Sequence, residues 1–180
     1  GAGERAFCAG ADLSKTVGAL TEGAPRHFPD PTKRFFSDTF KPIITAVNGL
    51  CTAGGTEMMQ GTDIRLAVPT ATFGLGEVRW GITPGGGSHT RLPRQIPWAV
   101  AMEILLTGQP ITAQRAYEVG LINKIVEPES LMDEAFAYAE KIAANGPLAV
   151  SAAKEMAVRG MALETPFTME YYISDRILRT

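Results

Sequence analysis

The sequence predicts a single α/β domain whose second half is mainly helical. In the first half, a strand, a glycine turn, a helix and a second strand follow one another, which is the order of an α/β unit with a largely parallel sheet. The second half instead shows apolar residues at helical spacing around one short strand. A length of 180 residues and a hydrophobic content of 45% suit one domain with a substantial core.

β-Branched residues and glycines divide the first half of the chain into short elements. Residues 43–47, IITAV, are enriched in strand formers, and Pro42 stops any helix before them. Glycines and prolines remove any period from residues 14–33, which predicts a long loop. The expected elements are a strand at 6–9, a helix or tight turn opening at 11–13, this loop, a short helix at 35–40, and then a strand at 43–47, a helix at 54–60 and a strand at 64–68.

Capping signals divide the second half into helices. Thr112 can cap a helix that Gly120 ends, and Ser130 with acidic residues in the next turn predicts another helix start. The expected elements are helices at 99–106 and 113–119, a strand at 122–126, a helix starting at 130, a helix from 147 to about 160 and a helical pattern at 170–180.

Composition excludes several classes of partner. Seventeen Lys and Arg against nineteen Asp and Glu give a net charge of −2, so no basic field attracts a nucleic acid. Cys8 and Cys51 form no CxxC pair and have no histidine cluster, which predicts neither a zinc site nor a disulfide framework and favours a reducing compartment. The apolar runs are far shorter than the ~20 residues of a membrane-spanning helix, so we expect a soluble protein without a membrane partner.

Both ends of the sequence are abrupt. The chain opens on Gly1 with a turn that leads into a strand end, without the pattern of a signal peptide. At the other end a helical pattern stops without a capping glycine or proline. We therefore expect that the chain lacks its beginning and is truncated at its end.

Two glycine turns could form a binding site for a negatively charged oxygen. They are FCAGAD at 7–12 and CTAGGTE at 51–57. Glycine lets another group approach the backbone, and a turn just before a helix presents unpaired N–H groups. If the two turns meet, they make an oxyanion hole; taken singly, each turn is equally a tight corner. Neither turn matches a phosphate-binding loop.

Two glutamates lie in surroundings that disfavour charge. Glu57 lies inside GGTEMM and Glu77 inside FGLGEVRW. Carboxylates in a partly apolar cleft have raised pKa values, and two close together tend to keep one proton between them. One can then act as base and the other as acid. The alternative is that both are solvated charges at the ends of elements. His89, in GGSHTRL, is expected to serve the start of a helix.

Four ordered motifs resemble the crotonase superfamily and, within it, the enoyl-CoA hydratases. They are FCAGADL, VNGLCTAGGTE, FGLGEVRWGITPGGG and MEILLTGQPITAQRAYEVGLINKIVE, and the resemblance runs from about residue 1 to about residue 160. It implies a spiral of β-β-α units with a C-terminal helical trimerisation region. Residues 1–108 would belong to the spiral core and residues 109–180 to the helical region. It also implies a homotrimer or a dimer of trimers.

The resemblance further implies a substrate and a site. The substrate would be an acyl-CoA thioester, and neither a metal nor a separate cofactor is expected, since coenzyme A is part of the substrate. The backbone N–H groups of Ala11 and Gly54 would hold the thioester oxygen, while Glu57 acts as base and Glu77 as acid in adding water to a trans-2-enoyl-CoA. The predicted substrate-binding residues are Ala9, Ala11, Asp12, Leu13, Ser14 and Gly54.

Several alternatives stay open. Isomerisation of a double bond or dehydration of a hydroxyacyl-CoA would use the same oxyanion hole, and a homologue that binds acyl-CoA without turnover would keep the same fold. Gly76, just before Glu77, stands where the family usually has proline. A bacterial cytoplasm is the expected location, or a mitochondrial matrix if the source is eukaryotic.

Overall fold

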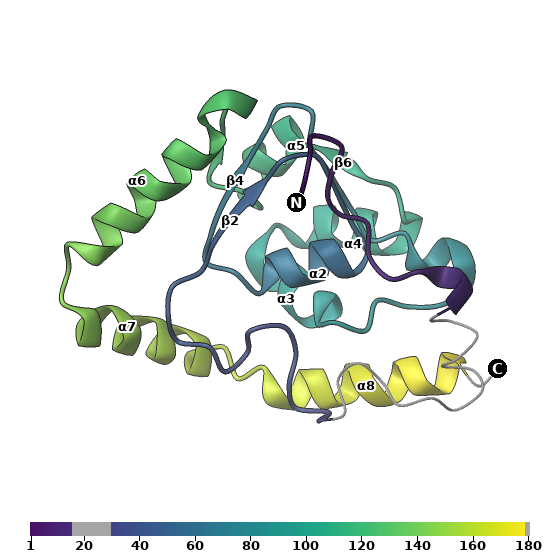
Figure 1. Cartoon of the computed structure of the whole chain (residues 1–180). Helices are drawn as coiled ribbons and strands as arrows, with labels where there is room; N and C mark the ends of the chain where they lie inside the picture. The colour runs from purple at the N-terminus through teal and green to yellow at the C-terminus, as the bar shows by residue number, and fades with distance from the viewer. Residues whose placement is uncertain (16–29, 179–180) are drawn as a thin grey trace.

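The computed structural model describes residues 1–15 and 30–178. Its strands are β1 (Ala6–Cys8), β2 (Ile44–Val47), β3 (Leu50–Thr52), β4 (Ile64–Ala67), β5 (Thr72–Gly74), β6 (Ile111–Thr112) and β7 (Lys124–Ile125). Its α-helices are α2 (Gly54–Gln60), α3 (Ser88–Gln95), α4 (Trp98–Thr107), α5 (Ala113–Glu118), α6 (Leu131–Ala143), α7 (Pro147–Gly160) and α8 (Glu164–Leu178). Two 3-10 helices are η1 (Glu77–Trp80) and η2 (Pro128–Ser130). Figure 1 shows how these elements are arranged.

The strands form two sheets, and from β1 to β5 the chain alternates between them. One sheet has the order β1-β3-β5-β6 and the other the order β2-β4-β7. Pairing is parallel except between β5 and β6. After β2 and β3 the chain enters α2, and after β4 and β5 it enters η1 and α3. Each circuit thus adds one strand to each sheet, followed by helix, which is a spiral of β-β-α units. The predicted α/β class is confirmed.

Three strands escaped the sequence analysis because they are very short. β3 and β5 have three residues each and β6 has two, too few to show a period of two. β3 lies in the stretch interpreted as a glycine turn. The register with neighbouring strands, rather than local pattern, defines such elements. The strand expected at 122–126 is β7 and covers only Lys124–Ile125.

The predicted short helix at 35–40 is wrong. Residues 35–38 form turns, in which Arg34 and Phe36 accept hydrogen bonds from the amides of Ser37 and Thr39. Phe36 has a φ of 57°, which no right-handed helix accommodates. Of the loop expected at 14–33, residues 14 and 15 are helical together with Leu13, and residues 16–29 lie outside the described part of the chain.

The helical half follows its capping signals with one exception. Thr112 Oγ1 accepts a hydrogen bond from the amide of Arg115 at 3.2 Å, so the predicted cap of α5 is confirmed. Ser130 makes no such bond, because η2 leads directly into α6 and the Ser130 backbone is already helical. Residues 111–125 add β6 and β7 to the two sheets.

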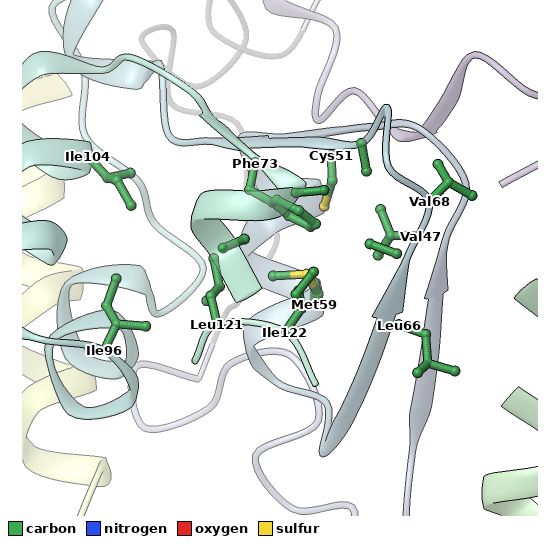
Figure 2. Packing of buried hydrophobic residues seen from close by; sticks show 14 of the residues in the cluster. Val47, Cys51, Met59, Leu66, Val68, Phe73, Ile96, Ile104, Leu121 and Ile122 are labelled. Atoms are coloured by element: carbon green, nitrogen blue, oxygen red, sulfur yellow. The ribbon is translucent and has the colours of Figure 1, made fainter. Parts of the chain in front are cut away.

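A core of buried apolar side chains lies between the sheets and helices. Figure 2 shows that side chains from both sheets, from α2 and from the later helices contribute to it, among them Val47, Leu66, Phe73, Met59 and Ile104. In contrast, α6, α7 and α8 follow one another around the rim, where α8 passes beside α3 (Figure 1). No helix in residues 1–15 and 30–178 has the length and apolarity that crossing a bilayer requires.

Candidate active site

The two glycine turns meet at one edge of a sheet. β1 and β3 pair in parallel with Cys8 opposite Cys51, so the turns that follow them start side by side. A Cβ on Gly10 would lie 2.7 Å from Ala53 Cβ and 3.3 Å from Gly54 N. Gly10 also has a φ of 83°. Both the close approach and the left-handed conformation therefore require glycine at position 10.

Gly54 is presented by a strained turn at the start of α2. As the first residue of the helix, its N–H has no acceptor within the helix. The preceding residue, Ala53, has φ 51° and ψ −127°, a conformation that residues with a side chain rarely adopt. Such strain persists where surrounding contacts impose it, here at the junction with Gly10.

The other predicted substrate-binding residues lie on the surface beside this junction. Ala9 and residues 11–14 are exposed. Asp12 Oδ1 accepts hydrogen bonds from Ser14 N at 3.0 Å and from Ser14 Oγ at 2.6 Å, which caps the helical turn that starts at Leu13. The structure thus places Ala11 one residue from Gly10, next to Gly54, with the side chains of Asp12 and Ser14 engaged with each other.

Glu57 lies buried in the first turn of α2. Side chains in a helix lean toward its N-terminus, which directs this carboxyl group toward the Gly54 end. Its Oε1 accepts a hydrogen bond from Gly86 N at 2.6 Å. A Cβ on Gly86 would lie 2.6 Å from Glu57 Oε2, so the carboxylate packs directly against this backbone. Gly86 thus both orients and confines Glu57.

Glu77 opens η1 and is also buried. Its Oε2 is enclosed by protein and has no hydrogen-bond partner within the described residues. Gly76, which replaces the usual proline, has φ −83°, near the angle that proline imposes. The glycine therefore keeps the backbone direction that a proline would give to Glu77.

Both carboxyl groups have raised pKa values, and the charge of Glu77 acts on Glu57. Burial, and then the negative charge of Glu77, raise the pKa of Glu57 to about 8; the charge of Glu170 adds to this, and the amides of Gly86 and Ser88 oppose it. Burial likewise raises the pKa of Glu77, while its own backbone amide and the charge of His89 lower it. The raised pKa values favour the protonated form of both carboxyl groups.

A third buried carboxylate, Glu170 on α8, was not predicted from the sequence. Its Oε1 lies 3.0 Å from Arg34 Nε, and its Oε2 lies 3.5 Å from Nδ1 of His89, the second residue of α3. One signal was available, since the buried residues Leu163, Phe167, Glu170 and Ser174 recur at helical spacing. That stripe shows a buried glutamate, but not which groups it faces.

The raised pKa of Glu57 predicts a pH-dependent gain in stability on its removal. The ordinary carboxyl pKa is near 4.5, so ionisation of the folded protein costs stability as the pH rises from about 4.5 to about 8. Glu57→Gln keeps an acceptor for Gly86 N and removes the charge. We expect an unchanged melting temperature at pH 4.5 and a rise of several degrees at pH 8, measured by thermal unfolding of both proteins. A difference independent of pH would contradict the raised pKa.

Comparison with known proteins places the chain in a family. The family model described as enoyl-CoA hydratase/isomerase matches residues 1–174. An (E)-benzylidenesuccinyl-CoA hydratase of Thauera aromatica is 43% identical over 161 residues, which cover 89% of this chain and 63% of the relative. A short-chain-enoyl-CoA hydratase of Clostridium acetobutylicum is 43% identical over 165 residues, covering 89% and 62%.

Solved structures agree with this placement. A carnitinyl-CoA dehydratase from Mycobacterium avium superposes with a TM-score of 0.86 at 36% identity, over 100% of this chain and 73% of that one. The chain spans about three fifths of the length of the two curated relatives. The match in fold therefore extends over all of this chain and part of each relative.

Proposed function

The chain belongs to the enoyl-CoA hydratase/isomerase family. We propose that it is part of an enzyme that adds water to the 2,3 double bond of a trans-2-enoyl-CoA and forms a 3-hydroxyacyl-CoA. The observation that carries this proposal is that Glu57 and Glu77 are both buried and that the charge of Glu77 acts on Glu57. Hydration needs both a base for water and an acid for carbon, whereas moving a double bond needs one group that carries a proton between two carbons.

In this proposal the glycine turns hold the thioester oxygen. The N–H groups of Ala11 and Gly54 donate to that oxygen, on which negative charge develops as hydroxide adds to C3. Donors aimed at a developing charge stabilise the transition state more than the ground state. The meeting of the two turns at Gly10 and Gly54 supports this role. CoA would lie along the exposed residues Ala9 and 11–14.

The two glutamates divide the proton transfers. Glu57 acts in its ionised form, which its pKa of about 8 leaves as the minor form at neutral pH. In that form it takes a proton from a water held between the carboxyl groups, and the water oxygen bonds to C3. Electrons of the double bond move to the thioester oxygen, and C2 then takes the proton of Glu77. The hydrogen bond from Gly86 N favours the negative charge on Glu57. The enclosed Glu77 Oε2 has no hydrogen-bond partner among residues 1–15 and 30–178, which suits a protonated oxygen. No cofactor beyond the CoA of the substrate enters.

Incubation with crotonyl-CoA tests the proposal. Hydration removes the conjugated thioester, so its ultraviolet absorbance should fall at a rate proportional to the protein concentration. Glu77→Gln, assayed in parallel, controls for a contaminating hydratase. If no absorbance is lost although the protein binds CoA thioesters, a panel of 3-enoyl- and hydroxyacyl-CoAs separates isomerase, dehydratase and non-catalytic binding. The first two show new product, and the last shows none.

The C-terminal helices support a proposed assembly. α6, α7 and α8 expose large apolar side chains, including Phe136, Leu148, Met156 and Tyr172. We propose that this surface joins subunits into a homotrimer or a dimer of trimers, with the helices α6, α7 and α8 of residues 109–180 as the oligomerisation region and β6 and β7 as part of the core. The relatives named above are bacterial, and this supports a bacterial cytoplasm as the proposed location.

A further inference from the structure

A buried ion pair connects α8 to the segment before β2. Arg34 Nε lies 3.0 Å from Glu170 Oε1, and their side chains are 1% and 2% exposed. Arg34 Nη2 also donates to the Phe167 carbonyl at 2.7 Å, and the guanidinium lies 5.3 Å from the centre of the Phe167 ring. A buried ion pair stabilises a fold only when additional hydrogen bonds of this kind compensate for removing its charges from water. The pair therefore fixes Arg34 against the face of α8 that carries Phe167 and Glu170.

Arg34 and Phe167 together form a wall behind the segment that holds Glu57. A Cβ on Gly87 would lie 3.1 Å from Phe167 Cε1 and 3.2 Å from Arg34 Cγ. Gly87 has a φ of 110°, so this backbone has the shape that only glycine adopts readily. Its neighbour Gly86 donates to Glu57. Movement of the wall would therefore displace the amide that orients the carboxylate.

We propose that Glu170 is a positioning residue for Glu57: through Arg34 it holds residues 86–87 in place, and its own negative charge acts on the Glu57 carboxyl group. The first part is the chain of contacts from Glu170 to Arg34, to Gly87 and to the Gly86 amide. The second part is the effect of the Glu170 charge on the protonation of Glu57. Its consequence for catalysis rests on the proposed function, in which Glu57 is the base.

Few charged groups act on Glu57, which makes the contribution of Glu170 measurable. Glu77 on η1 and Glu170 on α8 raise the pKa of Glu57, and Arg91 on α3 interacts with both Glu57 and Glu170. His89 Nδ1 lies 3.5 Å from Glu170 Oε2, and the charge of His89 lowers the pKa of Glu77. β1 and β3, which pack against α2, carry no charged residue. Removal of the Glu170 charge should therefore lower the pKa of Glu57.

Thermal unfolding tests this coupling without any catalytic turnover. At pH 8, Glu57→Gln should raise the melting temperature of the otherwise unchanged protein more than it raises that of Glu170→Gln, and the two increments should agree at pH 4.5. Glu164→Gln is the matched control, because it changes an exposed glutamate on the same helix. If the increment at pH 8 is the same in all three backgrounds, Glu170 does not act on Glu57 and the proposal is wrong.

Kinetics with crotonyl-CoA test the catalytic consequence. If Glu57 acts as the base, Glu170→Gln should move the acid limb of the kcat profile down by about one pH unit and leave KM within about twofold. A merely structural role would lower the amount of active protein equally at all pH values. If Glu170→Gln does not fold because Arg34 loses the carboxylate of Glu170, Arg34→Gln combined with Glu170→Gln removes both charges and must also move the acid limb to lower pH.

The two measurements separate the two proposals. A protein without hydratase activity that still shows the pH-dependent coupling contradicts the proposed function and supports the positioning by Glu170. An active hydratase whose pH profile and melting increments are unaffected by Glu170→Gln contradicts the positioning and leaves the proposed function standing.

Discussion

Glu57→Gln and Glu77→Gln are each expected to lower kcat for crotonyl-CoA hydration by about 10³-fold. Glutamine fills the same space and can still accept the hydrogen bond from Gly86 at position 57, but it neither takes a proton from water nor delivers one to carbon. Since the two groups serve one addition, the double variant should be little slower than either single one. Stopped assays with high protein concentrations measure the residual rates.

Substrate binding should survive both replacements. The N–H groups of Ala11 and Gly54 are untouched, so the Kd for a saturated acyl-CoA should stay within about twofold of the original value. Glu103→Gln, an exposed glutamate on α4, is the control for the substitution itself and should keep full activity. Near-normal turnover in Glu77→Gln would exclude Glu77 as the acid at C2.

The parts of this site that could be predicted are those that depend on residues close together in the sequence. Two glycines precede Glu57 at a strand-to-helix junction, and Gly76 precedes Glu77, so the unusual setting of each carboxylate is visible without coordinates. The structure buries both, and the charge of Glu77 acts on Glu57. Phe36 shows the limit of local reasoning, because its left-handed φ follows no signal in residues 35–40.

The parts that could not be predicted depend on contacts between distant segments. Arg34 and Glu170 are 136 residues apart, and no spacing rule relates them. Gly86 belongs to a run of three glycines that reads only as flexible backbone, yet one of the three donates to Glu57 and another packs against Phe167. Such roles arise from close packing in the folded chain, where a single added methyl group displaces neighbouring atoms.

Gly85 and Gly86 are neighbours, but they differ sharply in what an added methyl group would contact. At Gly86 a methyl group would lie 2.6 Å from Glu57 Oε2 and 2.9 Å from Phe35 Cε2, distances at which atoms must move. At Gly85 a methyl group would meet nothing within 4 Å, and this residue is exposed. Neither position has a left-handed φ, so alanine strains the backbone at neither. The two substitutions therefore differ in what the methyl group meets.

Gly86→Ala is accordingly expected to lower kcat about 10²-fold, whereas Gly85→Ala should leave kcat within about twofold. The methyl group at position 86 pushes the Glu57 carboxylate away from the water that it must deprotonate, and a displacement near 1 Å has effects of this size. KM should change little, because Gly54 and Ala11 keep their places. Steady-state kinetics and melting temperatures of both variants measure this, and equal kcat values would show that the position of Glu57 does not limit hydration.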